Sequence, residues 1–183
     1  MNGLIFNFNG RSKEGGVLSN FHKELVVVDG KKYPSGEAAF HAAKYFEASK
    51  RVGDGKRKAE LIEYGEKFEV GGAFGEMSSL EIKRKGGKKE GLALTASDLA
   101  NWSQTGVAVQ RKICRYKFDN DIKVVQCLKN HMTKVLVHPS RVSDAKIVGM
   151  TWEGRGKIVN GEVVVLGGNV LGNLWMEMRE ELL

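Results

Sequence analysis

The chain has 183 residues, of which 42% are apolar and 28% are charged, which suits one globular domain with its own core. No run of about 18 apolar residues occurs, and the N-terminal stretch lacks a basic segment followed by a long apolar one. The sequence therefore predicts neither a membrane-spanning helix nor a signal peptide. The net charge of +7 favours phosphate-bearing partners. Cys114 and Cys127 fit neither a disulfide framework nor a zinc spacing, so a reducing, cytoplasmic setting is expected.

The N-terminal part predicts a strand, a hairpin and a helix. Residues 3–8 alternate weakly between apolar and polar side chains, as in a short strand. Residues 24–33 place Asp29-Gly30 between two short strands, a strong hairpin signal. Ser35 is expected to cap a helix over about 36–49. The apolar stripe of this helix is formed by Ala39, Phe40, Ala43 and Phe46.

The middle of the chain is rich in charge and glycine. A short helix is predicted within 58–68, residues 69–79 are expected to form a loop, and residues 80–91 form a charged segment broken by glycines. Basic side chains gather at Lys83, Arg84, Lys85, Lys88 and Lys89, with a smaller group at Lys56, Arg57 and Lys58. Such a run is typical of a solvated surface loop, and the alternative is a nucleic-acid contact.

The C-terminal part alternates helices with short strands. Helices are predicted over about 105–118, where Gly106 is a weak point, over 122–132, and over the closing residues 169–183. A short strand is predicted at 134–139, and Asn160-Gly161 between apolar runs predicts a second hairpin. The order of elements indicates an α+β fold: a single, mainly helical domain over residues 1–183 with small β-hairpins.

Glu37 is the most informative side chain, because it is a carboxylate in the first turn of an apolar helix. Such a group either complements the helix terminus or does chemistry. His41 and Lys44 follow it by four and seven positions, on the same helical face. Glu and His at this spacing can bind a metal, but no third ligand has a suitable spacing, so no metal is expected. His41 is instead expected to hydrogen-bond Glu37 or to line a pocket.

Five separated segments resemble one family. They are GVLSNF at 16–21, YPSGEAAFHAAKYF at 33–46, IKRKGGK at 82–88, VQRKICRYKFDND at 109–121 after Trp102, and GGNVLGNLWMEMREEL at 167–182. They resemble, in order, the L-S-N-F, Y-P-T-x-E-H-A-F-Q, A-K-x-x-G-R, D-W…K-F-x-Q-N and G-x-N-x-L-G-x-x-L-M-x-x-R elements of the NADAR superfamily of YbiA-like proteins. The segments span nearly the whole chain.

The resemblance implies hydrolysis of an N-glycosidic bond without a cofactor. Family members act on ribosylamino-pyrimidine phosphates of early riboflavin synthesis or remove ADP-ribose from guanine. The implied partner is thus a phosphorylated ribosyl or ADP-ribosyl small molecule, or ADP-ribosylated nucleic acid. The family's glutamate, tryptophan and aspartate tied to activity correspond to Glu37, Trp102 and Asp144.

These residue types suit the chemistry. Breaking an N-glycosidic bond passes through a cationic, oxocarbenium-like sugar, which needs a fixed negative charge near C1′. Glu37 would stabilise that cation, deprotonate water or attack C1′. Asp144 would protonate the leaving nitrogen or hold ribose hydroxyls, unless it is a turn residue, and Trp102 would stack on a base, unless it is a core residue. The substrate-binding candidates are Ser19, Asn20, Phe21, His41, Lys44, Gly168, Asn169 and Arg179, of which Gly168 and Asn169 begin a helix that could seat a phosphate.

The sequence also departs from the family pattern. Ala38 replaces the histidine that normally follows the glutamate, and His41 replaces the usual glutamine. The D-x-x-W-G element near Asp144 is not cleanly present, and residues 50–90 form a long, basic insertion. Two alternatives therefore stay open: a catalytically inactive module that binds ADP-ribose or a nucleotide, and a nucleic-acid-binding protein that uses residues 83–89.

Overall fold

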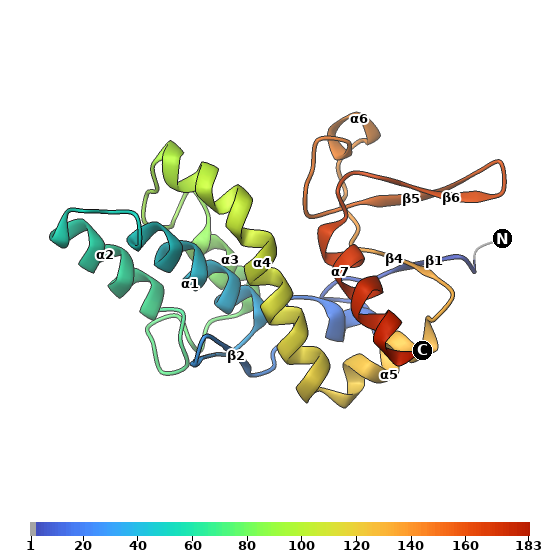
Figure 1. Ribbon diagram of the computed structural model, residues 1–183, viewed down its shortest axis with the longest axis horizontal. Helices are drawn as coiled ribbons and strands as arrows, with labels where there is room; N and C mark the ends of the chain where they lie inside the picture. The colour runs from blue at the N-terminus through green and yellow to red at the C-terminus, as the bar shows by residue number, and fades with distance from the viewer. Residues whose placement is uncertain (1–2) are drawn as a thin grey trace. The chain divides into compact units, whose positions relative to one another are not determined.

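The computed structural model describes residues 3–183, and this part of the chain forms seven α-helices and three two-stranded sheets (Figure 1). The helices are α1 (Gly36–Ser49), α2 (Gly55–Glu66), α3 (Ser79–Gly86), α4 (Ala96–Asn120), α5 (Ile122–Asn130), α6 (Asp144–Ile147) and α7 (Val170–Arg179). The strands are β1 (Ile5–Asn7), β2 (Val26–Val28), β3 (Lys31–Tyr33), β4 (Val135–Val137), β5 (Arg155–Val159) and β6 (Glu162–Leu166). The predicted α+β class, with more helix than strand, is confirmed. None of the helices within 3–183 combines the length and apolar character needed to cross a bilayer.

The chain divides into two compact units. The central unit is one continuous segment, Asn20–Tyr116, and the terminal unit joins the residues up to Ser19 with Lys117–Leu183. Helix α4 begins in the central unit and ends in the terminal unit. The expectation of a single domain over residues 1–183 stays a prediction.

Both predicted hairpins are confirmed. β2 pairs antiparallel with β3, and β5 pairs antiparallel with β6. At the first turn Asp29 and Gly30 have φ values of 49° and 79°, and at the second Asn160 and Gly161 have 52° and 86°. Two consecutive left-handed residues twist a two-residue loop in the same sense as its strands, which is why the sequence signal is strong.

Helix α1 lies at the centre of the core of the central unit. Ser35 has an extended backbone, and its Oγ accepts a hydrogen bond from Ala38 N at 3.2 Å, so the predicted cap and the helix over 36–49 are both confirmed. Small side chains of α1 are fully buried, which lets neighbouring elements approach its backbone closely. The core around them includes Val26, Tyr33, Tyr45, Leu61, Phe68, Ile82 and Ile113.

The middle of the chain differs from the expectations in two places. The basic run was interpreted as a surface loop, but its first part is helical, because Ser78 and Glu81 form a reciprocal capping box that starts α3. This helix ends at Gly86, where the glycine break was expected. Helix α4 begins at Ala96 rather than near 105, because Thr95 and Asp98 hydrogen-bond each other's backbone N–H groups. Gly106 does not break this helix.

The terminal unit is built on a parallel strand pair. β1 lies beside β4, with Ile5 opposite Val135 and Asn7 opposite Val137. The closing helix α7 buries one side as predicted, and Trp175 on that side is fully enclosed. Its indole N–H donates to Leu18 O at 2.9 Å, so the N-terminal segment is held by the C-terminal helix.

Candidate active site

Glu37 occupies the second position of α1 and is only 8% exposed. Its backbone N–H donates to Asn20 O at 2.9 Å, which joins the helix start to the Ser-Asn-Phe loop. Its Oε1 lies 3.2 Å from His41 Nε2. Within residues 3–183 this is the one hydrogen bond recorded for the carboxylate, so Oε2 is available to a ligand. The first turn of a helix favours a negative charge.

The loop beside Glu37 is fixed by a pair of amides. Asn20 Nδ2 donates to Gln110 Oε1 at 2.8 Å, and Gln110 Nε2 donates back to Asn20 Oδ1 at 2.9 Å. A Cβ on Gly36 would lie 2.8 Å from Asn20 Oδ1, so only glycine fits at this helix start. Gln110 is buried and escaped the sequence analysis, because it lies 90 positions from its partner. Asn20 therefore supports the site chiefly through its backbone carbonyl, which accepts the hydrogen bond of the Glu37 backbone N–H.

His41 lies between Glu37 and the end of α3. Its side chain is 12% exposed, and Nε2 faces the Glu37 carboxylate. Its Nδ1 is buried and has no hydrogen-bond partner among residues 3–183. The expectation that His41 hydrogen-bonds Glu37 agrees with this geometry. In the same part of the chain, Glu37 and His41 belong to no group of three side chains that could hold a metal ion.

Lys44 lies one turn beyond His41 and is tied to α3. Its ammonium donates to Gly86 O at the end of that helix and lies 5.1 Å from the centre of the Tyr45 ring. Burial lowers the pKa of Lys44 to about 8, although the nearby Glu37 carboxylate raises it. Lys44 therefore contributes a positive charge on the same face as Glu37, and at mildly alkaline pH it loses that charge.

Two aromatic side chains meet on the same face of the central unit. Phe40 of α1 and Trp102 of α4 are half-buried, with ring centres 4.8 Å apart and planes at 66°. Gly106 leaves room for the indole, since a Cβ there would lie 3.1 Å from Trp102 Cε2. Phe40 was predicted to belong to the apolar stripe of α1, but its position three residues after Glu37 puts it on the face of the candidate site.

Phe21 lies next to the basic helix. Its carbonyl accepts from Ser79 Oγ at 2.9 Å, and Lys83 Nζ lies 5.6 Å from its ring centre. The basic run is therefore no detached loop, because its first lysine is on a helix that contacts the predicted site residues. The structure thus brings together Asn20, Phe21, Glu37, His41, Lys44 and Trp102 in the central unit.

The other predicted site residues belong to the terminal unit, where several of their polar atoms bind neighbouring groups of the protein. Asn169 is 1% exposed; its Oδ1 accepts from His138 N at 3.0 Å and its Nδ2 donates to Leu136 O at 2.9 Å. Gly168 has no room for a side chain, since a Cβ would lie 2.4 Å from Thr151 O. In the same unit, Ser19 O accepts from Lys117 Nζ, and Arg179 donates to His131 O and Lys134 O.

Asp144 opens the short helix α6 and is paired with two cations. Its oxygens accept hydrogen bonds from Lys157 Nζ and Arg155 Nη1, and these bonds hold the pKa of Asp144 below its usual range. A carboxylate in this state keeps no proton at neutral pH. Of the two roles considered for Asp144, holding hydroxyl groups suits this environment better than protonating a leaving nitrogen.

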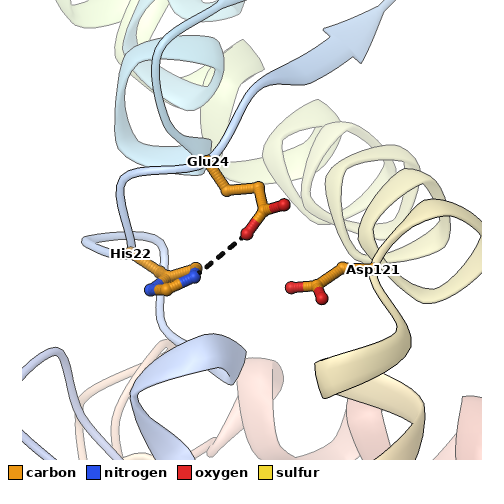
Figure 2. A group of neighbouring side chains, drawn as sticks. All are labelled: His22, Glu24 and Asp121. Carbon is orange, nitrogen blue, oxygen red and sulfur yellow. Dashed lines mark hydrogen bonds and ion pairs between the residues drawn. The ribbon is translucent and has the colours of Figure 1, made fainter.

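A second histidine–carboxylate pair occurs near the start of the central unit. His22 Nε2 lies 3.1 Å from Glu24 Oε2, as Figure 2 shows. Asp121, also drawn there, belongs to the terminal unit, where its Oδ1 accepts from Lys123 N and caps α5. The pair is more exposed than Glu37 and His41, and no sequence motif is associated with it.

Comparison with known proteins identifies relatives over the full length. No family model matches the chain. Curated proteins called N-glycosidase YbiA from Shigella sonnei and Escherichia coli are 29% and 27% identical to it, and each alignment covers 100% of this chain and 91% of the relative. The NMR structure of the E. coli protein YbiA aligns with 100% of this chain and 86% of its own, with a TM-score of 0.59 and 25% identity. The order of the five sequence segments, the α+β architecture and these full-length matches agree with one another, and they support a YbiA-like member of the NADAR family.

Proposed function

We propose that this protein is an N-glycosidase that hydrolyses the bond between C1′ of a phosphorylated ribose and a base or amine nitrogen. The observation that supports it most is the buried Glu37 carboxylate at the start of α1, hydrogen-bonded on one oxygen by His41. The relatives that bear the name N-glycosidase YbiA agree with this class of reaction.

The site offers the negative charge that the reaction needs. As the C1′–N bond breaks, its electron pair leaves with the nitrogen and C1′ becomes electron-poor. Glu37 Oε2 would face that carbon and stabilise the cation, or take a proton from the attacking water. Water supplies the new C1′–O bond and, in total, one proton to the departing nitrogen. Because the carboxylate is held by the protein before the substrate arrives, little reorganisation is needed during the reaction.

The surroundings of Glu37 indicate a substrate with a flat base and a phosphate. The Phe40 and Trp102 rings offer an aromatic surface against which a base could stack. Lys44, which donates to Gly86 O, and Lys83, which lies over the Phe21 ring, add positive charge. We propose two substrate classes on this basis: ribosyl-amine phosphates, and ADP-ribose attached to guanine in a nucleotide or in nucleic acid.

A nucleic-acid substrate is favoured by one further observation. Lys83, Lys88 and Lys89 are exposed, whereas Arg84 and Lys85 contact Glu90 at 2.6 and 3.4 Å. The three exposed lysines leave a basic surface on and after α3 that suits phosphates outside the reacting nucleotide. The affinity for DNA through this surface would fall steeply with added salt, because about one counterion is released for each phosphate contacted.

The test is to incubate the purified protein separately with guanine-ADP-ribosylated DNA and with ribosylamino-pyrimidine phosphate, beside its Glu37→Gln variant. Release of ADP-ribose or ribose phosphate by the wild type alone is the expected result, and the substrate that reacts identifies the class. Glutamine preserves the size of the side chain and its hydrogen bonding while removing the charge.

The alternative of an inactive binding module predicts a different outcome. In that case neither substrate is cleaved, and ADP-ribose binds equally well to the wild type and to Glu37→Gln. Binding of unmodified DNA that persists in Lys83→Ala, Lys88→Ala and Lys89→Ala combined would argue against the basic surface.

A further inference from the structure

Gly86, the last residue of α3, lies against the ring of His41. A Cβ built on Gly86 would be 2.1 Å from His41 Cγ, 2.2 Å from Nδ1 and 2.6 Å from Cδ2. No side chain larger than hydrogen fits there while the ring keeps its place. The backbone does not demand glycine, since Gly86 is not among the residues with positive φ.

The same residue also fixes Lys44. The Gly86 carbonyl accepts the hydrogen bond of the Lys44 ammonium, and it belongs to the carbonyl end of a helix, where a positive charge is favoured. His41 and Lys44 are three positions apart on one face of α1, and Glu37 is on that face as well. Gly86 of α3 therefore contacts both His41 and Lys44, the two neighbours of the proposed catalytic carboxylate.

We propose that Gly86 is a positioning residue for Glu37: by lacking a side chain, it seats the His41 ring where Nε2–H donates to Glu37 Oε1. His41 then presents its other nitrogen, Nδ1, bare against Gly86. A hydrogen on Nδ1 would be a buried donor with no acceptor among residues 3–183, whereas a hydrogen on Nε2 meets a carboxylate. The packing thus selects one tautomer of the neutral ring, and this tautomer orients Glu37.

The effect on turnover rests on the proposed function, but the contact itself can be tested without substrate. Nitrogen NMR of the full chain labelled at its 4 histidines reads the tautomer of each ring directly, and His41→Gln assigns the signal of His41. We expect the wild-type ring to carry its hydrogen on Nε2. In Gly86→Ala the ring must move, so its signals shift and the two tautomers mix.

Gly53→Ala is the matched control, because a Cβ on Gly53 meets nothing within 4 Å and Gly53 has no positive φ. It should leave the His41 signals unchanged. A hydrogen on Nδ1 in the wild type, or unchanged His41 signals in Gly86→Ala, would overturn the proposal. Either result can be obtained even if the protein cleaves neither test substrate, so failure of this proposal is distinct from failure of the proposed function.

Kinetics with the substrate that the wild type cleaves provide the second readout. Displacing Glu37 through the ring should lower kcat about ten- to a hundredfold in Gly86→Ala, with little change in KM. His41→Gln, which keeps an N–H donor, should retain most of the turnover, and His41→Ala should not. In the His41→Ala background there is no ring to displace, so Gly86→Ala should cause little further loss. Additive losses in that double variant would refute positioning through His41.

The test remains decisive whether or not Gly86→Ala folds correctly. Alanine favours helix over glycine, so the substitution at the end of α3 is not expected to unfold that helix. If Gly86→Ala nevertheless misfolds, the double variant with His41→Ala still decides the question. Restored folding there would support the contact, and persistent misfolding would show that Gly86 serves another part of the unit.

Discussion

Buried polar side chains make different use of their polar atoms in the two units. In the central unit the Glu37 carboxylate is buried, yet among residues 3–183 only one of its oxygens is hydrogen-bonded. In the terminal unit the Asn169 amide is also buried, but both of its polar atoms bind backbone groups. A buried polar side chain with an unused atom can serve a ligand, whereas one whose atoms are all used stabilises the fold. On this ground we expect the chemistry in the central unit.

The largest expected effect is on Glu37. Replacing Glu37 with Gln should lower kcat about 10²–10³-fold, because it removes the charge that faces C1′ while the side chain keeps its shape. The thermal midpoint should hardly change. Steady-state kinetics and a thermal melting curve check this prediction. Wild-type turnover in the variant would show that Glu37 is not the catalytic carboxylate.

The second expected effect is on Asn169, and it concerns stability rather than turnover. Asn169→Ala leaves His138 N and Leu136 O without their partner and places alanine at a φ of 47°, so it should cost about 2–4 kcal/mol of unfolding free energy. Denaturant titration measures this loss. Asn173→Ala, on the exposed side of α7, is the matched control and should cost less. A fall in kcat of the folded Asn169 variant would instead make Asn169 part of the site.

A smaller effect is expected from the charge of Lys44. Its pKa is 10.5 in the unfolded chain and about 8 in the folded protein, so between these values the unfolded chain binds a proton that the folded protein does not. Stability due to Lys44 therefore rises as the pH rises from about 8 to 10.5, and it is lowest at neutral pH. The unfolding free energy of the wild type should gain about 3 kcal/mol relative to Lys44→Met across this window. A constant difference between the two proteins would contradict the shift.

The smallest effect on turnover is expected from Asp144. Because Lys157 and Arg155 keep this carboxylate deprotonated, Asp144→Asn should lower kcat much less than Glu37→Gln does. The acidic limb of the pH–rate profile should also stay in place. Equal losses in the two variants would restore Asp144 as the second catalytic carboxylate.

The sequence alone predicted the elements whose signals are local. Ser35 marked the start of α1, and Asp29-Gly30 and Asn160-Gly161 marked both hairpins, since each depends on a few adjacent residues. The start of α4 was missed although Thr95 and Asp98 form a capping pair, because Gly106 suggested a later start. Close packing against Trp102 explains why glycine occurs inside that helix.

The contacts within the candidate site could be predicted in part for the same reason. Glu37 and His41 are one helical turn apart, so their contact follows from spacing. Contacts between distant segments had no such signal: Gln110 reaches Asn20 across 90 positions, and Gly86 touches His41 only after α1 and α3 have packed. The structural role of Asn169 was equally hidden, because a G-G-N turn looks the same whether it binds a phosphate or two backbone groups.

The parallel pairing of β1 with β4 has a consequence for how the chain is made. Ile5 can pair with Val135 only after Val135 has left the ribosome, and Leu18 can accept the hydrogen bond of Trp175 only after Trp175 has been synthesised. The central unit is one continuous segment that ends at Tyr116, so all of it is synthesised before most of the terminal unit, and we expect it to begin folding while synthesis continues. The terminal unit closes last, over contacts of long sequence separation, which form slowly. A chain interrupted before α7 would therefore carry the residues around Glu37 on a folded segment whose two ends are still unpaired.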